Sequence, residues 1–67
     1  MKIFLNNSEE FFEPEDLTVS RILELKQFKT KLMMVKVNGN LVKKADWNKF
    51  NIRHGDDVHI VMITNGG

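Results

Sequence analysis

The stretch HGDDVHIVMI, residues 54–63, decides the fold of this chain. Its first four residues include a glycine and two aspartates, which is the composition of a tight turn, and its last six are almost entirely apolar. Because side chains alternate along a strand, one apolar set lies on each side: Val58, Ile60 and Met62 on one face, Val61 and Ile63 on the other. Strands that are apolar on both faces usually lie inside a sheet, so residues 58–63 are predicted to form a central strand.

A hairpin at the start of the chain is predicted to lie beside this central strand. In residues 1–5 apolar and polar residues alternate, and Asn6-Asn7 is turn chemistry. Residues 8–12 are expected to return as a second strand. Pro14 ends that strand because proline has no N–H to donate to a ladder.

A second hairpin is predicted in the middle of the chain. Residues 32–37 have the composition of a strand, and the Asn-Gly pair at 38–39 is the strongest short signal for a two-residue hairpin turn. Residues 40–42 begin the return strand. The segment 43–50 is too short for a stable helix, and we expect a turn or a short 3₁₀ piece anchored by Trp47.

One helix is predicted between the two hairpins. Thr18 is a good N-cap, and Val19, Ile22 and Leu23 have the spacing of one apolar helix face. With a single helix to cover one sheet face, the economical architecture is a mixed sheet packed on that helix, with the last strand inserted beside the first. This is an α+β fold of the β-grasp, or ubiquitin-like, type, and residues 1–67 form a single domain.

The composition limits the class of protein. The chain has 67 residues, 42% of them hydrophobic, which is enough for one small core. It has no cysteine, which excludes disulfides and cysteine redox chemistry in the chain itself. The formal net charge of +1 lacks the basic excess of nucleic-acid binding proteins, and no segment resembles a secretory signal or a membrane span. We therefore expect a cytoplasmic protein, monomeric when free, without nucleic-acid or membrane partners and without a bound cofactor.

The last four residues, TNGG at 64–67, follow directly from the predicted central strand. Glycine has no side chain, so a flexible Gly66-Gly67 tail can enter a narrow active site and leave the α-carboxylate of Gly67 unshielded. Such a carboxylate is ionised at neutral pH and can attack the α-phosphate of ATP on a partner enzyme. The acyl-adenylate then accepts a sulfur or amine nucleophile. The alternative is an end without function, which is common in proteins.

Several local patterns resemble those of one known family. Residues 35–42 (VKVNGNLV) are similar to its hairpin VAVNGEIV, and residues 55–61 (GDDVHIV) are similar to its turn and strand GDxVxIV. Residues 1–6 resemble its first strand, residues 17–24 (LTVSRILE) its helix start, and Trp47 and the terminal Gly-Gly also match. In order, spacing and length, the whole chain resembles the ThiS family of sulfur carrier proteins of thiamine biosynthesis.

The resemblance implies a protein cosubstrate and not an enzyme. In that family an E1-like, ThiF-like adenylyltransferase uses ATP to activate the terminal glycine, and a persulfide derived from a cysteine desulfurase supplies sulfur. The resulting thiocarboxylate donates its sulfur to a ThiG-like thiazole synthase. On this chain the resemblance assigns the thiocarboxylate to Gly67, with Gly66 and Asn65 as the tail that precedes it.

These partners need a surface on which to dock. Phe4, Val61 and Ile63 are predicted to form an exposed apolar platform for them. Apolar side chains on strands are also the usual content of a core, so burial is the alternative for all three.

Two other groups of residues, the methionines and the histidines, are not expected to form a binding site. Met33, Met34 and Met62 are expected to fill the core rather than to bind a ligand. The spacing of His54 and His59 matches no familiar ligand set, so no metal site is expected.

Three other functions stay open. The small subunit of molybdopterin synthase, of the MoaD type, resembles this fold and tail but is usually longer. A β-grasp interaction or RNA-binding module would have no use for the terminal glycines, and a ubiquitin-type modifier would transfer the same adenylate to a lysine. Removal of Gly67 is expected to abolish activation of either sulfur carrier and to be harmless to a binding module.

Overall fold

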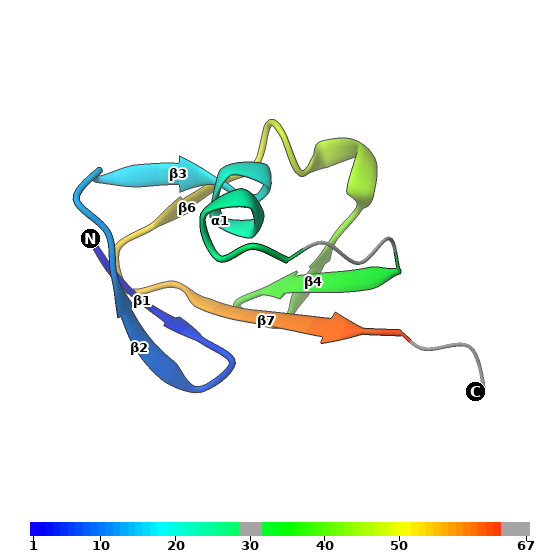
Figure 1. Ribbon diagram of the computed structural model, residues 1–67, viewed down its shortest axis with the longest axis horizontal. Coiled ribbons are helices and arrows are strands. Elements are labelled where there is room, and N and C mark those ends of the chain that lie inside the picture. The colour runs from blue at the N-terminus through cyan, green and yellow to red at the C-terminus, as the bar shows by residue number, and fades with distance from the viewer. Residues whose placement is uncertain (29–31, 64–67) are drawn as a thin grey trace.

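The computed structural model describes residues 1–28 and 32–63. Within them the elements are β1 (Lys2–Leu5), β2 (Ser8–Phe11), β3 (Asp16–Thr18), α1 (Val19–Leu25), β4 (Met33–Val37), β5 (Asn40–Val42), the 3₁₀ turn η1 (Lys44–Asp46), β6 (Asn51–Arg53) and β7 (Asp57–Met62). A five-stranded sheet has the order β2-β1-β7-β4-β5, and β3 pairs with β6 in a separate two-stranded sheet. Helix α1 and the small sheet lie on the same side of the large one (Figure 1).

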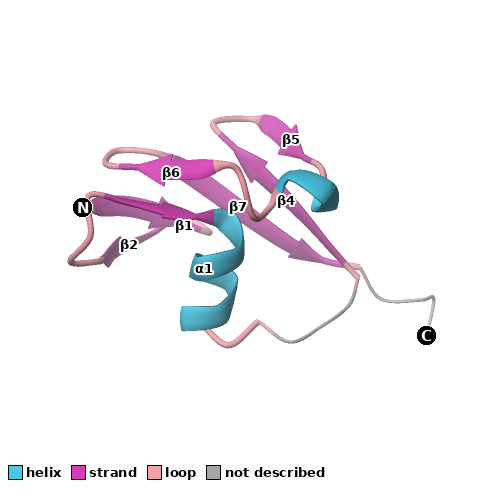
Figure 2. Ribbon diagram, turned by 90° about the horizontal axis from the view of Figure 1, so that it is seen from above, coloured by secondary structure: helices cyan, strands magenta, loops and turns pink. Residues whose placement is uncertain are grey.

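The predicted central strand is confirmed as β7. It runs parallel to β1, where Leu5 pairs with Val58, and antiparallel to β4, where Val35 pairs with Ile60. The sheet is therefore mixed, and α1 packs on one of its faces, which Figure 2 shows from above. This confirms the predicted α+β architecture.

Helix α1 begins and packs as its sequence indicates. The Oγ1 of Thr18 accepts a hydrogen bond from the N–H of Arg21 (3.1 Å), which satisfies one of the free donors of the first turn. Its buried side chains join the strands in one core, whose members are Ile3, Leu5, Val19, Ile22, Leu23, Val35, Val37, Val42, Trp47, Ile52, Val58 and Ile60. In the described part of the chain, no helix is both long and apolar enough to cross a membrane.

Both predicted hairpins are present, and their turns share one geometry. Asn6 and Asn7 have φ of 50° and 70°, and Asn38 and Gly39 have φ of 52° and 84°. Two consecutive residues with positive φ are the requirement of a type I′ turn, and asparagine and glycine tolerate that region best. The turn matches the twist of the strands that it joins, so each hairpin has a defined register.

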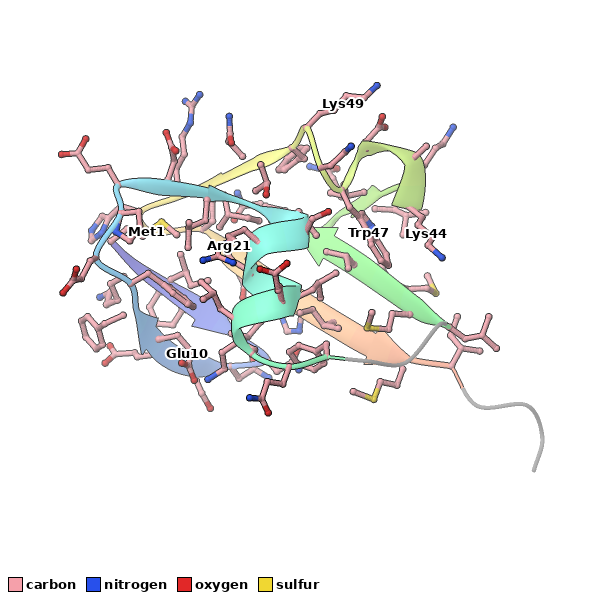
Figure 3. All side chains as sticks on the ribbon, turned by 45° about the horizontal axis from the view of Figure 1, so that its top comes forward. Met1, Glu10, Arg21, Lys44, Trp47 and Lys49 are labelled. Carbon is pink, nitrogen blue, oxygen red and sulfur yellow. The ribbon has the colours of Figure 1, made fainter. Side chains whose placement is uncertain are left out.

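The Trp47 anchor is also confirmed. Its side chain is only 8% exposed, and its Nε1 donates a hydrogen bond to the C=O of Val42 (3.0 Å). Figure 3 shows Trp47 beside α1, and its own C=O accepts from the N–H of Ser20 (2.9 Å). One aromatic residue thus ties the return strand β5 to the start of the helix.

Two expectations differ from the structure. Strands β3 and β6, which pair Leu17 with Ile52, were not predicted, because each is only three residues long and carries polar neighbours. The core assignment holds for Met33, which packs against the core, but it is wrong for Met62, which is 51% exposed, and for Met34, which lies on the opposite face of the sheet. A seven-residue helix is about 10 Å long and a six-residue strand about 20 Å, so α1 leaves the end of β7 uncovered.

Candidate functional site

The candidate site is the end of β7, from which the tail continues. Pairing with β4 extends one residue beyond the strand, because the N–H of Ile63 donates to the C=O of Leu32 (2.9 Å). The predicted tail, residues 64–67, lies outside the described residues, so its flexibility and the role of Gly67 stay predictions. What the described residues define is the surface from which the tail departs.

Apolar side chains gather on the face of the large sheet that points away from α1, which we call the outer face. Val61 and Ile63 lie there, 51% and 43% exposed. Met34 on β4 is directly opposite Val61, and Leu32 is next to Ile63. These four residues form the outer apolar patch. In the described residues no element covers it, and it lies at the end of β7 nearest the C-terminus (Figure 1).

The predicted platform is divided in the structure. Val61 and Ile63 belong to the outer apolar patch, but Phe4 lies on β1 opposite Asp57, at the other end of β7. The Phe4 side chain is half-buried, and the ammonium of Lys2 sits 5.1 Å from its ring centroid. Phe4 is therefore engaged within its own strand, and a partner that covers the patch need not reach it.

A polar strip separates Phe4 from the outer apolar patch. Lys36 on β4 is directly opposite His59, and the His59 Nε2 lies 3.3 Å from a carboxylate oxygen of Asp57. A charged border beside an apolar centre is the usual anatomy of a protein interface. The outer face thus has an apolar end, from which the tail leaves, and a polar middle.

Sequence reasoning missed Leu32 and assigned Met34 to the core. Leu32 and Met34 are two positions apart, as are Val61 and Ile63, so each pair is expected on one face of its strand. This spacing was the signal that could have identified them. The pairing of these two segments could not be predicted from the sequence, because no turn joins them and their register depends on the tertiary fold.

The histidines interact with neighbouring residues of the fold and not with a metal site in the described residues. The Nδ1 of His54 accepts a hydrogen bond from the backbone N–H of Lys2 (3.0 Å), which attaches the turn before β7 to the first strand. A surface hollow is lined by Met1, Glu15, Asp16, Arg53 and His54, residues that lie away from the outer apolar patch. Among residues 1–28 and 32–63, no three histidine or acidic side chains are placed to hold a metal ion.

Comparison with known families gives a match over nearly the whole chain. The model of the ThiS family matches residues 2–67. Among curated proteins, the uncharacterized protein ycf40 of Trieres chinensis is 27% identical over 66 residues, which are 98% of this chain and 90% of that protein.

Solved structures have the same fold. A crystal structure of the thiamine biosynthesis protein ThiS from Geobacter metallireducens superposes with a TM-score of 0.87, at 23% identity, and each chain covers the other completely. An NMR structure of a thiamine biosynthesis protein from the same organism gives a TM-score of 0.81 at 20% identity, covering 100% of this chain and 88% of that one. At these identities the likeness establishes the fold, which agrees with the predicted β-grasp.

Proposed function

The chain belongs to the ThiS family, and from that premise we propose that it is a sulfur carrier protein of thiamine biosynthesis. It is a cosubstrate of other enzymes rather than a catalyst, and it works in the cytoplasm together with them. The observation that carries the proposal is the family match, which extends over residues 2–67 and includes both terminal glycines.

The proposed chemistry takes place on the carboxylate of Gly67. A carboxylate oxygen attacks the α-phosphate of ATP in the site of a ThiF-like adenylyltransferase, and pyrophosphate leaves. The terminal sulfur of a persulfide, supplied by a cysteine desulfurase, attacks the acyl carbon, and AMP leaves. A thiol cleaves the remaining S–S bond, and the thiocarboxylate then transfers its sulfur to the thiazole that a ThiG-like synthase builds. Gly66 and Asn65 form the tail that enters each active site.

The outer apolar patch supports this role because it adjoins the end of β7. A partner that covers Val61 and Ile63 gains the free energy of burying apolar surface, and the tail then begins within its reach. ATP is bound by the partner, so the chain itself needs only a docking surface and a slender tail. We propose the patch, rather than Phe4, as the main contact with the adenylyltransferase.

Intact mass spectrometry tests the proposal. The purified protein is incubated with the adenylyltransferase of its host, ATP and a persulfide source, beside a variant that lacks Gly67 and a sample without ATP. We expect a mass gain equal to the replacement of one oxygen by one sulfur in the full chain alone. The starting mass also tests whether Gly67 carries a free carboxylate.

Each other result has a defined meaning. No mass change, under conditions in which a known carrier reacts, contradicts the proposal and favours a β-grasp binding module. A thiocarboxylate that transfers sulfur to a molybdopterin precursor and not to the thiazole assigns the chain to the MoaD type. Adducts on lysines of other proteins assign it to the ubiquitin-type modifiers.

A further inference from the structure

Two asparagines form side-chain hydrogen bonds with the backbone of β7, one at its start and one in its second half. Asn6 and Asn38 each occupy the first central position of a type I′ turn, with φ of 50° and 52°. The side-chain oxygen of Asn38 accepts from the N–H of Asp57 (2.9 Å), at the start of β7. The side-chain oxygen of Asn6 accepts from the N–H of Ile60 (2.8 Å), two residues before the last residue of β7.

The surroundings of the two asparagines differ. At its start, β7 is paired on both sides, with β1 at Asp57 and Val58 and with β4 at the same level. Strand β1 stops at Leu5, so beyond Val58 the β1 side of β7 is bonded by Asn6. The backbone N–H of Asn6 donates to the C=O of Val58 (2.9 Å), and its Nδ2 donates to the C=O of Ile60 (3.3 Å).

The Asn6 carboxamide thus replaces the peptide group that a longer β1 would supply. Both backbone groups of Ile60 are satisfied by one side chain, through two hydrogen bonds that are themselves partly buried. After Ile60 the described pairing of β7 is with the β4 side alone, through Val61, Met62 and Ile63. A two-stranded ribbon is marginally stable by itself, so its direction depends on the last point at which it is fixed to the body.

We propose that Asn6 is a positioning residue for sulfur loading: its carboxamide sets the course of residues 61–63 and so orients the outer apolar patch for docking of the adenylyltransferase. This inference rests on the proposed function. Asn6 touches no reacting atom, and it acts through Ile60. Asn38 bonds the first residue of the same strand, away from the outer apolar patch, and has no part in the orientation of that patch.

The test compares Asn6→Gly with Asn38→Gly. Glycine accepts positive φ, so each substitution keeps its turn and removes only the side-chain amide. Adenylation is followed by pyrophosphate release, with kcat and KM determined for each variant, and stability is measured by denaturant unfolding. For Asn6→Gly we expect KM to rise about five- to tenfold with little change in kcat. This is the change in affinity that corresponds to the net free energy of about one hydrogen bond. For Asn38→Gly we expect unchanged KM at a comparable loss of stability.

Amide hydrogen exchange gives a readout that needs no partner. In Asn6→Gly the amides of Ile60 and Ile63 are expected to exchange faster, and in Asn38→Gly the amide of Asp57 alone. Asn6→Asp keeps the acceptor for the Ile60 N–H and loses the donor to its C=O, so it should fall between wild type and Asn6→Gly in both measurements.

The outcomes separate the inference from the proposed function. Equal changes in KM for the two glycine variants, or unchanged exchange at Ile63 in Asn6→Gly, overturn the positioning role and leave Asn6 as a purely structural residue. Absence of adenylation in the wild type overturns the proposed function instead. In that case faster exchange at Ile63 still supports, and unchanged exchange still contradicts, control of the strand end by Asn6.

Discussion

The two faces of the five-stranded sheet are made by the same strands but have different roles. Where α1 covers the inner face, the side chains are at most 6% exposed: Ile3, Leu5, Val35, Val37, Val58 and Ile60. The outer face of these strands carries Val61, 51% exposed, together with Lys36 and His59. Neighbouring residues of β7 therefore face two different environments.

The difference teaches that an apolar side chain on a central strand does not imply burial. Within residues 1–28 and 32–63, one α-helix of seven residues covers a sheet of five strands, so one face of that sheet has no cover there. Burial on the inner face supplies stability, whereas apolar groups left on the outer face are available to another protein. The adjacent residues Ile60 and Val61 test this difference best, because Ile60 lies on the inner face and Val61 on the outer face.

The largest effect is expected from Ile60→Ala on the inner face. Removing a buried isoleucine side chain leaves a cavity, and the free energy of unfolding should fall by about 2–4 kcal/mol. Chemical denaturation followed by circular dichroism measures the change. A loss below about 0.5 kcal/mol, the range typical of surface sites, would mean that the inner face is not the core.

A smaller effect is expected from Trp47→Phe, at the β5 end of the inner face. Phenylalanine keeps most of the aromatic packing but cannot donate to the C=O of Val42, which leaves a buried acceptor unpaired. The free energy of unfolding should fall by about 1–3 kcal/mol. The same denaturation experiment checks it, and an unchanged midpoint would show that water or another donor replaces the indole N–H.

The smallest effect on stability, and a large one on partner binding, is expected from Val61→Asp. Val61 is half exposed, so the free energy of unfolding should change by no more than about 0.5 kcal/mol. A charge in the outer apolar patch should nevertheless raise KM for the adenylyltransferase, because burying an unpaired carboxylate is costly.

Phe11→Asp is the matched control for Val61→Asp. Phe11 is 73% exposed on the edge strand β2, away from the end of β7. Its substitution should leave both stability and KM near the wild-type values. If the two variants raise KM equally, the outer apolar patch is not the docking surface.

Much of the fold could be predicted from local patterns. The Thr18 cap, the Asn-Gly turn at 38–39 and the alternation of residues 1–5 each depend on neighbours within one turn or one strand. The position of β7 was predictable because a strand apolar on both sides needs neighbours on both edges. Strands β3 and β6 were not, because three-residue strands paired across more than thirty positions have no local signal.

The candidate site was predictable only in part. Val61 and Ile63 were identified by their spacing, but Met34 was assigned to the core and Phe4 to the same platform. Which residues share a patch depends on the register of β4 and β1 against β7. No turn connects these strand pairs directly, so their register is set by packing and not by sequence neighbours.

The sequence by itself determined the helix, the two hairpins with their turns and the central strand, and it determined the family through the order and spacing of its motifs. Only the tertiary structure decided which apolar residues are left exposed, that Asn6 replaces the missing end of β1, and that Leu32 and Met34 stand beside Val61 and Ile63. The physical reason is the range of the interactions. Helix caps and turns are stabilised within a few residues, whereas exposure and strand register follow from how distant segments pack together.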